Sequence, residues 1–321
     1  MSEFESASGE SSPMRSSPVV VIVIGMAGSG KSTLMHRINL SMNDSNKRGY
    51  YVNLDPAVKS VPFAANIDIR DTVNYKEVME QYNLGPNGAI LTSLNLFATR
   101  FDQVIEILEK RAEETDFVFV DTPGQIEAFT WSAGGQIILE LLASTFPTCL
   151  LYVSDSARCT SPTTFMSNML YCCSVLYKSN LPVITVFNKI DAVSCAYALE
   201  WMTDFESYLD ASENTSTRDG EYMSSLNRSL ALVMDEFYSN ISAIGVSAAT
   251  GEGIPDLFLK VEAAAIEFRE SYLPELQRRI RLREQSEVVR QQRDLEALRG
   301  DMAEERGDKV IADGSKKAGH V

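Results

Sequence analysis

The stretch Gly25-Met26-Ala27-Gly28-Ser29-Gly30-Lys31-Ser32 (GMAGSGKS) decides the fold of this 321-residue chain. It follows the apolar, β-branched run Val19–Ile24 and leads into a helical pattern over Thr33–Leu40. A strand, a glycine-rich turn ending in Gly-Lys-Ser and a helix together form a phosphate-binding loop. Because both neighbouring segments are of the required kind, the motif is much more than a chance glycine-rich turn.

Each residue type of this loop has a chemical task. Glycines let backbone N–H groups curl around a phosphate, and the start of the following helix adds partial positive charge. We expect Lys31 to reach the β- and γ-phosphates and the Ser32 hydroxyl to ligate Mg²⁺. The candidate phosphate-binding residues are Gly28, Ser29, Gly30, Lys31, Ser32 and Thr33.

Outward from the loop, short apolar runs alternate with helical stretches. The runs show little alternation of apolar and polar residues, which is typical of strands covered by helices on both faces. The sequence therefore predicts an α/β fold, a P-loop NTPase with a mainly parallel central sheet flanked by helices. The predicted strands are Val19–Ile24, Tyr50–Leu54, Phe117–Val120, Cys149–Val153, Val183–Phe187 and Ala243–Val246.

The composition divides the chain into three parts. Residues 1–17 are Ser-rich and predict a disordered tail, and residues 18–270 carry the α/β pattern, interrupted by a predicted polar surface loop at Asp210–Tyr222. Residues 271–321 predict a charged, helical or disordered tail. Its opposite charges lie at helical spacing, as at Glu275 and Arg279, but its apolar positions hold no strict heptad, which favours a solvated helix over a coiled coil.

Charge and cysteine usage exclude several classes of protein. Lys and Arg number 29 against 44 Asp and Glu, a net charge of −15 that argues against a DNA or RNA binder. Five cysteines without zinc-site spacing and only two histidines offer no zinc site or His-rich metal centre, so we expect buried free thiols. The start of the chain has no apolar segment typical of a secretory signal, which predicts a soluble intracellular protein.

A second loop, Asp121-Thr122-Pro123-Gly124-Gln125, follows the predicted strand Phe117–Val120. An aspartate at the carboxyl end of a strand beside a phosphate loop can hold the hydration shell of Mg²⁺. The N–H of Gly124 can approach the γ-phosphate and sense its presence. Ser32 and Asp121 are therefore the candidate metal ligands.

A third loop, Asn188-Lys189-Ile190-Asp191, indicates the base. The Asp191 carboxylate can accept hydrogen bonds from guanine N1 and its exocyclic amine, whereas adenine offers no matching pair of donors. Lys189 can lay its stem along the ring, and Asn188 can tie loops together. The stretch Ser247–Thr250 resembles a loop whose backbone N–H, here at Ala248, contacts guanine O6. GTP and GDP are thus the predicted ligands, ahead of ATP.

Further stretches of the sequence resemble the motifs of one particular protein family. Four of them closely resemble the motifs of the GPN-loop GTPases: Asn53–Ala57, Ala65–Asp71, Leu84–Ala89 (which contains Gly-Pro-Asn) and Asp121–Glu127. Two more, Ser161–Leu170 and Trp201–Glu206, are similar to the first eukaryotic paralogue of that family. The resemblance covers about residues 18–270.

The resemblance implies a dimeric, GTP-hydrolysing switch that assists assembly and nuclear import of RNA polymerase II. The second subunit would be a related GPN-loop paralogue or a second copy of the chain, and polymerase subunits would be the client. It implies a cytoplasmic protein that shuttles to the nucleus. With a net charge of −15, we expect protein–protein contacts, with no direct nucleic-acid binding and no membrane.

The resemblance also assigns catalytic candidates. Pro86-Asn87-Gly88 alone would predict a routine β-turn. The resemblance implies instead that the side-chain amide of Asn87 crosses a dimer interface to the γ-phosphate or the attacking water of the partner. It points to Asp55, Gln125 and Glu127 for positioning or activating that water. No arginine finger is assignable from spacing, and Arg70 is at least as readily a structural ion-pair partner.

Two alternatives stay open at this stage. A small-molecule phosphotransferase could use the same scaffold, although the sequence shows no recognisable acceptor-binding motif. A GTPase metal chaperone would need a His/Cys cluster that the chain does not offer. The apolar stretch Thr130–Phe146 is either a core helix or, because it follows the Asp121 loop, a client surface that responds to the nucleotide.

Overall fold

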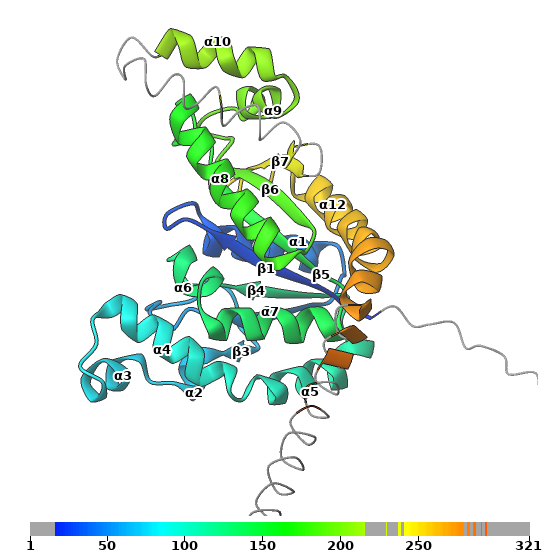
Figure 1. The fold of residues 1–321 in the computed structure, drawn as a ribbon. Coiled ribbons are helices and arrows are strands. Elements are labelled where there is room, and N and C mark those ends of the chain that lie inside the picture. Colours follow the sequence, from blue (N-terminus) through cyan, green and yellow to red (C-terminus); the bar gives the residue numbers. More distant parts are fainter. Residues whose placement is uncertain are drawn as a thin grey trace, which may run out of the picture. The chain divides into compact units, whose positions relative to one another are not determined.

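The computed structural model describes residues 17–215, 229, 237–238 and 241–278, together with helical positions 281–282, 285–286, 290 and 293. The chain divides into two compact units, Met1–Glu270 and Ser271–Val321. The first unit contains a sheet with helices on both faces (Figure 1). In the second unit, the described residues 273–278 are helical.

In the described residues, seven parallel strands form one sheet in the order β3-β2-β4-β1-β5-β6-β7. The strands are β1 Val19–Gly25, β2 Gly49–Asn53, β3 Ile67–Asp68, β4 Phe117–Asp121, β5 Thr148–Asp155, β6 Val183–Asn188 and β7 Ser242–Val246. The predicted fold class is confirmed, and the predicted strands lie within two residues of the observed ends. The strand β3 was missed because two residues carry no recognisable pattern.

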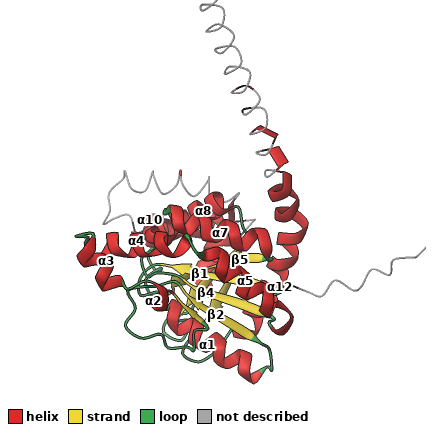
Figure 2. Cartoon of the chain, turned by 90° about the horizontal axis from the view of Figure 1, so that it is seen from below, coloured by secondary structure: helices red, strands yellow, loops and turns green. Residues whose placement is uncertain are grey.

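Helices cover the two faces of the sheet. They are α1 Lys31–Asp44, α2 Ile69–Thr72, α3 Tyr75–Gln81, α4 Pro86–Ala98, α5 Phe101–Arg111, α6 Ile126–Thr130, α7 Ala133–Thr145, α8 Pro162–Ser179, α9 Ala196–Thr203, α10 Phe205–Thr215 and α12 Ile254–Glu267. Short 3₁₀ and π turns span Ala112–Glu114 and Phe268–Tyr272. Helix α1 lies on the face opposite to α7 and α8 (Figure 2).

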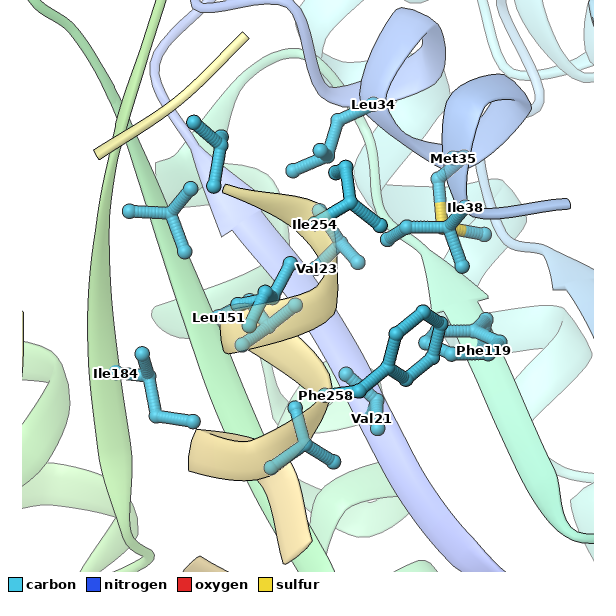
Figure 3. Close-up of a cluster of buried hydrophobic side chains, with 14 of the residues drawn as sticks. Val21, Val23, Leu34, Met35, Ile38, Phe119, Leu151, Ile184, Ile254 and Phe258 are labelled. Carbon is cyan, nitrogen blue, oxygen red and sulfur yellow. The ribbon is translucent and has the colours of Figure 1, made fainter. Parts of the chain in front are cut away.

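Buried side chains beneath α1 and α12 fix the position of α1, the helix that follows the phosphate loop. Leu34 and Ile38 of α1 meet Ile254 and Phe258 of α12 over the β1 side chain Val23, and all are buried (Figure 3). The apolar residues of α1 recur at helical spacing, so one face of the helix is fixed on the sheet. The amino end of α1 is thereby anchored at the carboxyl edge of β1.

The four loops assigned to the phosphates, the metal and the base lie at one edge of the sheet. They follow the carboxyl ends of β1, β4, β6 and β7, and these ends meet at the same edge because the strands are parallel. Strand β1 has β4 on one side and β5 on the other, with Val23 paired to both Asp121 and Leu151. Open α/β sheets bind ligands in the crevice outside such strand ends.

The predicted surface loop at Asp210–Tyr222 is wrong in its first half, since α10 continues to Thr215. The helix begins after Asp204, whose carboxylate accepts from the Glu206 N–H at 3.0 Å. Tyr208 anchors it by packing against the rings of Phe165 and Trp201. Once such a start is fixed, each further residue extends a helix at little cost, even through polar sequence.

Most of the predicted terminal tails and the second half of the predicted surface loop fall outside the described residues. This holds for residues 1–16 of the predicted N-terminal tail, residues 216–222 of the predicted loop and most of residues 279–321. Across the part of the chain that is described, no helix has both the length and the apolar character to cross a bilayer. The five cysteines are free and four of them are buried, as expected.

Candidate active site

The phosphate loop joins β1 to α1 with a backbone that requires glycine. Gly28 and Gly30 have φ angles of +82° and +93°, in the left-handed region. A Cβ atom on Gly30 would lie 2.5 Å from the side-chain nitrogen of Asn188. Helix α1 begins at Lys31, so its first-turn N–H groups are directed toward the loop. This is the geometry of an anion site.

Lys31 is buried at the base of the loop. Its Nζ donates to the carbonyls of Gly25 and Met26 at 2.8 and 3.3 Å. Burial lowers the pKa of the Lys31 ammonium, and the charges of Asp121 and Asp55 oppose that shift. This buried ammonium, held by two carbonyls and near two carboxylates, can donate to the oxygens of a bound polyphosphate, and such hydrogen bonds are strong because both groups are charged.

Ser32 and Asp121 meet beside the loop. The Ser32 hydroxyl donates to Asp121 Oδ2 at 3.0 Å. Asp121 is 3% exposed, and its Oδ1 has no hydrogen-bond partner among the described residues. Burial raises the pKa of Asp121 to about 6. A hydroxyl and an unpaired carboxylate oxygen next to a phosphate site are the donors that Mg²⁺ takes, so these residues fit that ion.

The side chain of Asn188 ties three loops together. Its Nδ2 donates to Ser29 O at 2.9 Å, and its Oδ1 accepts from the N–H groups of Lys189 and Ala248 at 2.8 and 3.1 Å. The Ala248 N–H is thus already used within the protein, so the expected contact with guanine O6 would share this donor. The Asp191 carboxylate is oriented by Ser247, whose Oγ donates to Oδ1 at 2.6 Å.

Lys189 connects the base loop to the phosphate loop. Its backbone has a φ of +68°, and its Nζ donates to Gly28 O at 2.9 Å and to Asp155 Oδ2 at 2.7 Å. Sequence reasoning missed Asp155 at the end of β5. The signal was available, because an aspartate that ends a buried parallel strand lies at the same edge as the other loops.

Arg37 was also missed, and no sequence signal could have found it. From the exposed side of α1 it reaches the loop after β7, where Nε donates to Ala248 O at 3.0 Å and Nη2 donates to Ala249 O. Only the folded arrangement of α1 and this loop brings the groups together. Arg37 therefore braces the loop that was assigned to the guanine base.

Two of the four catalytic candidates are in direct contact. Gln125 Nε2 donates to Asn87 Oδ1 at 2.7 Å within the same chain. The β-turn expected around Asn87 is instead the first turn of α4, with Gly85 as N-cap and Pro86 at the first helical position. Proline suits that position because its missing N–H would have no partner within the helix anyway.

The two acidic candidates lie apart, one in a loop and one in a helix. Asp55 follows β2, where its Oδ1 accepts from the Ala57 N–H at 2.9 Å and its charge acts on Lys31. Glu127 is exposed in the first turn of α6. Arg70 forms a two-point ion pair with Asp68, with Nε–Oδ1 and Nη2–Oδ2 distances of 2.9 and 2.6 Å. The ion-pair interpretation of Arg70 is therefore confirmed.

Fold and site together define a P-loop nucleotide-binding protein. A parallel sheet ends in a phosphate loop, a metal-type carboxylate and an Asn-Lys-x-Asp loop, and one asparagine side chain links the phosphate and base loops.

Comparison with known proteins identifies a family within the class of P-loop nucleotide-binding proteins. A family model described as "Conserved hypothetical ATP binding protein" matches residues 23–267. GPN-loop GTPase 1 of Dictyostelium discoideum is 52% identical over 300 residues, covering 94% of this chain and 75% of the relative. GPN-loop GTPase 1 of Schizosaccharomyces pombe is 50% identical over 290 residues, covering 89% of this chain and 79% of the relative.

A solved structure agrees with these relatives. The apo crystal structure of PAB0955, a GTPase from Pyrococcus abyssi, has a TM-score of 0.67 and 26% identity, covering 79% of this chain and 98% of that chain. The chain belongs to the GPN-loop GTPase family, and within it to paralogue 1. The family model's description names ATP, whereas the relatives are named GTPases, and the carboxylate at Asp191 favours guanine.

Proposed function

We propose that this chain binds GTP and hydrolyses it to GDP and phosphate. The observation that carries the proposal is the Asn188 side chain, which joins the phosphate loop to a base loop that ends in Asp191. A guanine base and a triphosphate bound at these two loops would be held at a fixed separation. Membership of the GPN-loop GTPase family supports the same chemistry.

The roles of the residues follow from their positions. Lys31 and the first-turn N–H groups of α1 hold the β- and γ-phosphates, and Asp191 selects the base. Ser32 and Asp121 would hold Mg²⁺, which neutralises charge on the β- and γ-phosphate oxygens. Gln125 is positioned by its contact with Asn87 and can orient a water toward the γ-phosphate.

Product analysis tests this function. Purified protein supplied with GTP and Mg²⁺ should release inorganic phosphate and GDP in equal amounts, and chelation of Mg²⁺ should stop the reaction. Lys31→Ala, prepared identically, controls for a contaminating phosphatase and should be inactive. Transfer of the γ-phosphate to a metabolite, with no free phosphate, would replace the GTPase by the phosphotransferase alternative.

We further propose that the protein works as a dimer, with a related GPN-loop paralogue or with itself, and assists assembly and nuclear import of RNA polymerase II. It would then move between cytoplasm and nucleus. The family resemblance supports this role, and the net charge of −15 favours protein partners over nucleic acid.

Exposed apolar side chains at the end of α6 and on α7 support a protein partner. Trp131, which ends α6, is 54% exposed, and Ile137 on α7 is 47% exposed. The rest of α7 is anchored, since Ile138 and Leu142 are buried and the Gly134 N–H donates to Asn95 Oδ1 of α4 at 2.9 Å. The stretch Thr130–Phe146 thus contains both core residues and an exposed apolar face, which can bind a partner.

Binding of purified RNA polymerase II subunits tests this surface. The double variant Trp131→Ala, Ile137→Ala should bind them at least about 10-fold more weakly, since buried aromatic anchors dominate interfaces. Leu259→Ala is the matched control, because Leu259 is 64% exposed on α12, on another part of the first unit. Equal binding by the two variants would exclude Trp131 and Ile137 as the client surface.

A further inference from the structure

Arg158 lies against the phosphate loop, although no motif singled it out. It belongs to the turn that follows β5, and its Nη1 is 3.5 Å from the carbonyl oxygen of Ala27. A Cβ atom on Gly28 would lie 3.4 Å from its Nη2. The guanidinium thus borders two consecutive residues of the loop that is built to surround phosphate.

Asp155 places this arginine beside the base loop as well. Its Oδ2 lies 3.6 Å from Arg158 Nε and accepts from Lys189 Nζ at 2.7 Å. The Asp155 carboxylate is almost fully buried, and on the strand next to β5 its backbone register partner is Asn188. One fixed aspartate therefore holds two cations side by side, Lys189 over Gly28 and Arg158 over Ala27 and Gly28.

The protein contacts of Arg158 do not account for its position. Its side chain is 67% exposed, and its contacts of 3.5 and 3.6 Å are too long to stabilise the fold much. A guanidinium carries five N–H donors in a planar fork that matches phosphate oxygens. With two cations and one carboxylate in the group, a surplus positive charge faces the phosphate loop of a protein whose net charge is −15.

The neighbours of Arg158 indicate which part of the nucleotide it contacts. The γ-phosphate end of the site is marked by Ser32 and Asp121, whereas Arg158 lies with Lys189, where the phosphate and base loops meet. The part of a guanine nucleotide between base and β-phosphate is the ribose with the α-phosphate, and the α-phosphate carries the charge. We propose that Arg158 binds an α-phosphate oxygen of the nucleotide, with Asp155 as its positioning residue.

This assignment rests on the proposed binding of guanine nucleotides and has a defined kinetic consequence. The α-phosphate is present in both GDP and GTP and does not change charge during hydrolysis. A contact made equally in the ground state and the transition state adds affinity without accelerating the chemical step. Arg158 is therefore a binding residue, and it does not act as an arginine finger on the γ-phosphate.

Equilibrium titration and single-turnover hydrolysis test the first half of the proposal. Arg158→Ala should bind GDP and a non-hydrolysable GTP analogue about 10-fold more weakly and by the same factor, while hydrolysis at saturating GTP stays within about twofold. Arg48→Ala is the matched control, an exposed arginine paired with Asp116 at the amino ends of β2 and β4. Unchanged GDP affinity in Arg158→Ala, or a loss confined to the hydrolysis rate, would overturn the assignment.

Sulfur substitution separates a direct contact from a mere brace of the phosphate loop. The two diastereomers of GDPαS replace one non-bridging α-oxygen each. If Arg158 donates to one of these oxygens, that diastereomer should lose more affinity in the wild type than in Arg158→Ala. Identical sulfur effects in both proteins would mean that Arg158 only supports the loop. These titrations use GDP compounds alone, so they decide the matter even if the wild type does not hydrolyse GTP.

Discussion

Asp191→Asn should lower the affinity for GTP by roughly 100-fold or more and remove the preference for GTP over ATP. The Asp191 carboxylate accepts two hydrogens from guanine, and an asparagine amide must present a donor where an acceptor is needed. Ser247 Oγ donates to Asp191 Oδ1 at 2.6 Å, so the carboxylate is fixed before any base arrives. Competition of GTP and ATP against a fluorescent GDP measures the change.

Two further measurements sharpen this prediction. Xanthine has a carbonyl in place of the exocyclic amine of guanine, so an asparagine at position 191 should bind XTP better than the wild type does. Ser247→Ala keeps the carboxylate but removes its orienting hydrogen bond, so it should cost only about 10-fold in GTP affinity. If Asp191→Asn discriminates GTP from ATP as the wild type does, the carboxylate does not select the base.

The sequence predicted the sheet well because buried parallel strands have a local signature. The six apolar runs matched strands within two residues. The central strands β4, β5 and β6 are buried along their whole length, so their side chains cannot alternate between apolar and polar, whereas the edge strand β7 is only partly buried. Strand β3 is two residues long and is set by its pairing with β2, which is not a local property. The helix through Asp210–Thr215 depended in the same way on a distant contact, the packing of Tyr208 on Phe165.

The motifs of the candidate site could be predicted from the sequence, but the hydrogen bonds between its loops could not. A motif states which residue types a loop needs, so Lys31, Asp121 and Asp191 could be named directly. The bonds that unite the loops join residues far apart in the chain, as from Asn188 to Ser29 or from Arg37 to Ala248. Such pairs have no sequence spacing to detect, and only the parallel sheet brings them to one edge.

Asn87→Ala should lower the rate of GTP hydrolysis by about 100- to 1,000-fold, the loss seen when one preorganised donor at a developing charge is removed. GDP affinity should stay near that of the wild type, because Asn87 belongs to α4 and not to the nucleotide loops. Its Oδ1 accepts from Gln125 Nε2 at 2.7 Å, which leaves the amide hydrogens of Asn87 free to donate to phosphate or water. Single-turnover hydrolysis with the purified protein measures the effect, and a near wild-type rate would remove Asn87 from the catalytic group.

If the protein forms the proposed dimer with itself, the same variant tells whether Asn87 acts on its own subunit or on the partner. The family resemblance implies the partner, whereas the contact with Gln125 lies within one chain. Lys31→Ala should be inactive alone, and Asn87→Ala should keep only the low residual rate expected above. In a mixed dimer, the Lys31→Ala subunit would supply its intact Asn87 to the intact phosphate loop of the other subunit. An equimolar homodimer mixture should then regain about a quarter of wild-type activity, since half of the dimers are mixed and each has one complete site. Mixed dimers that form but stay inactive would show that Asn87 serves its own chain.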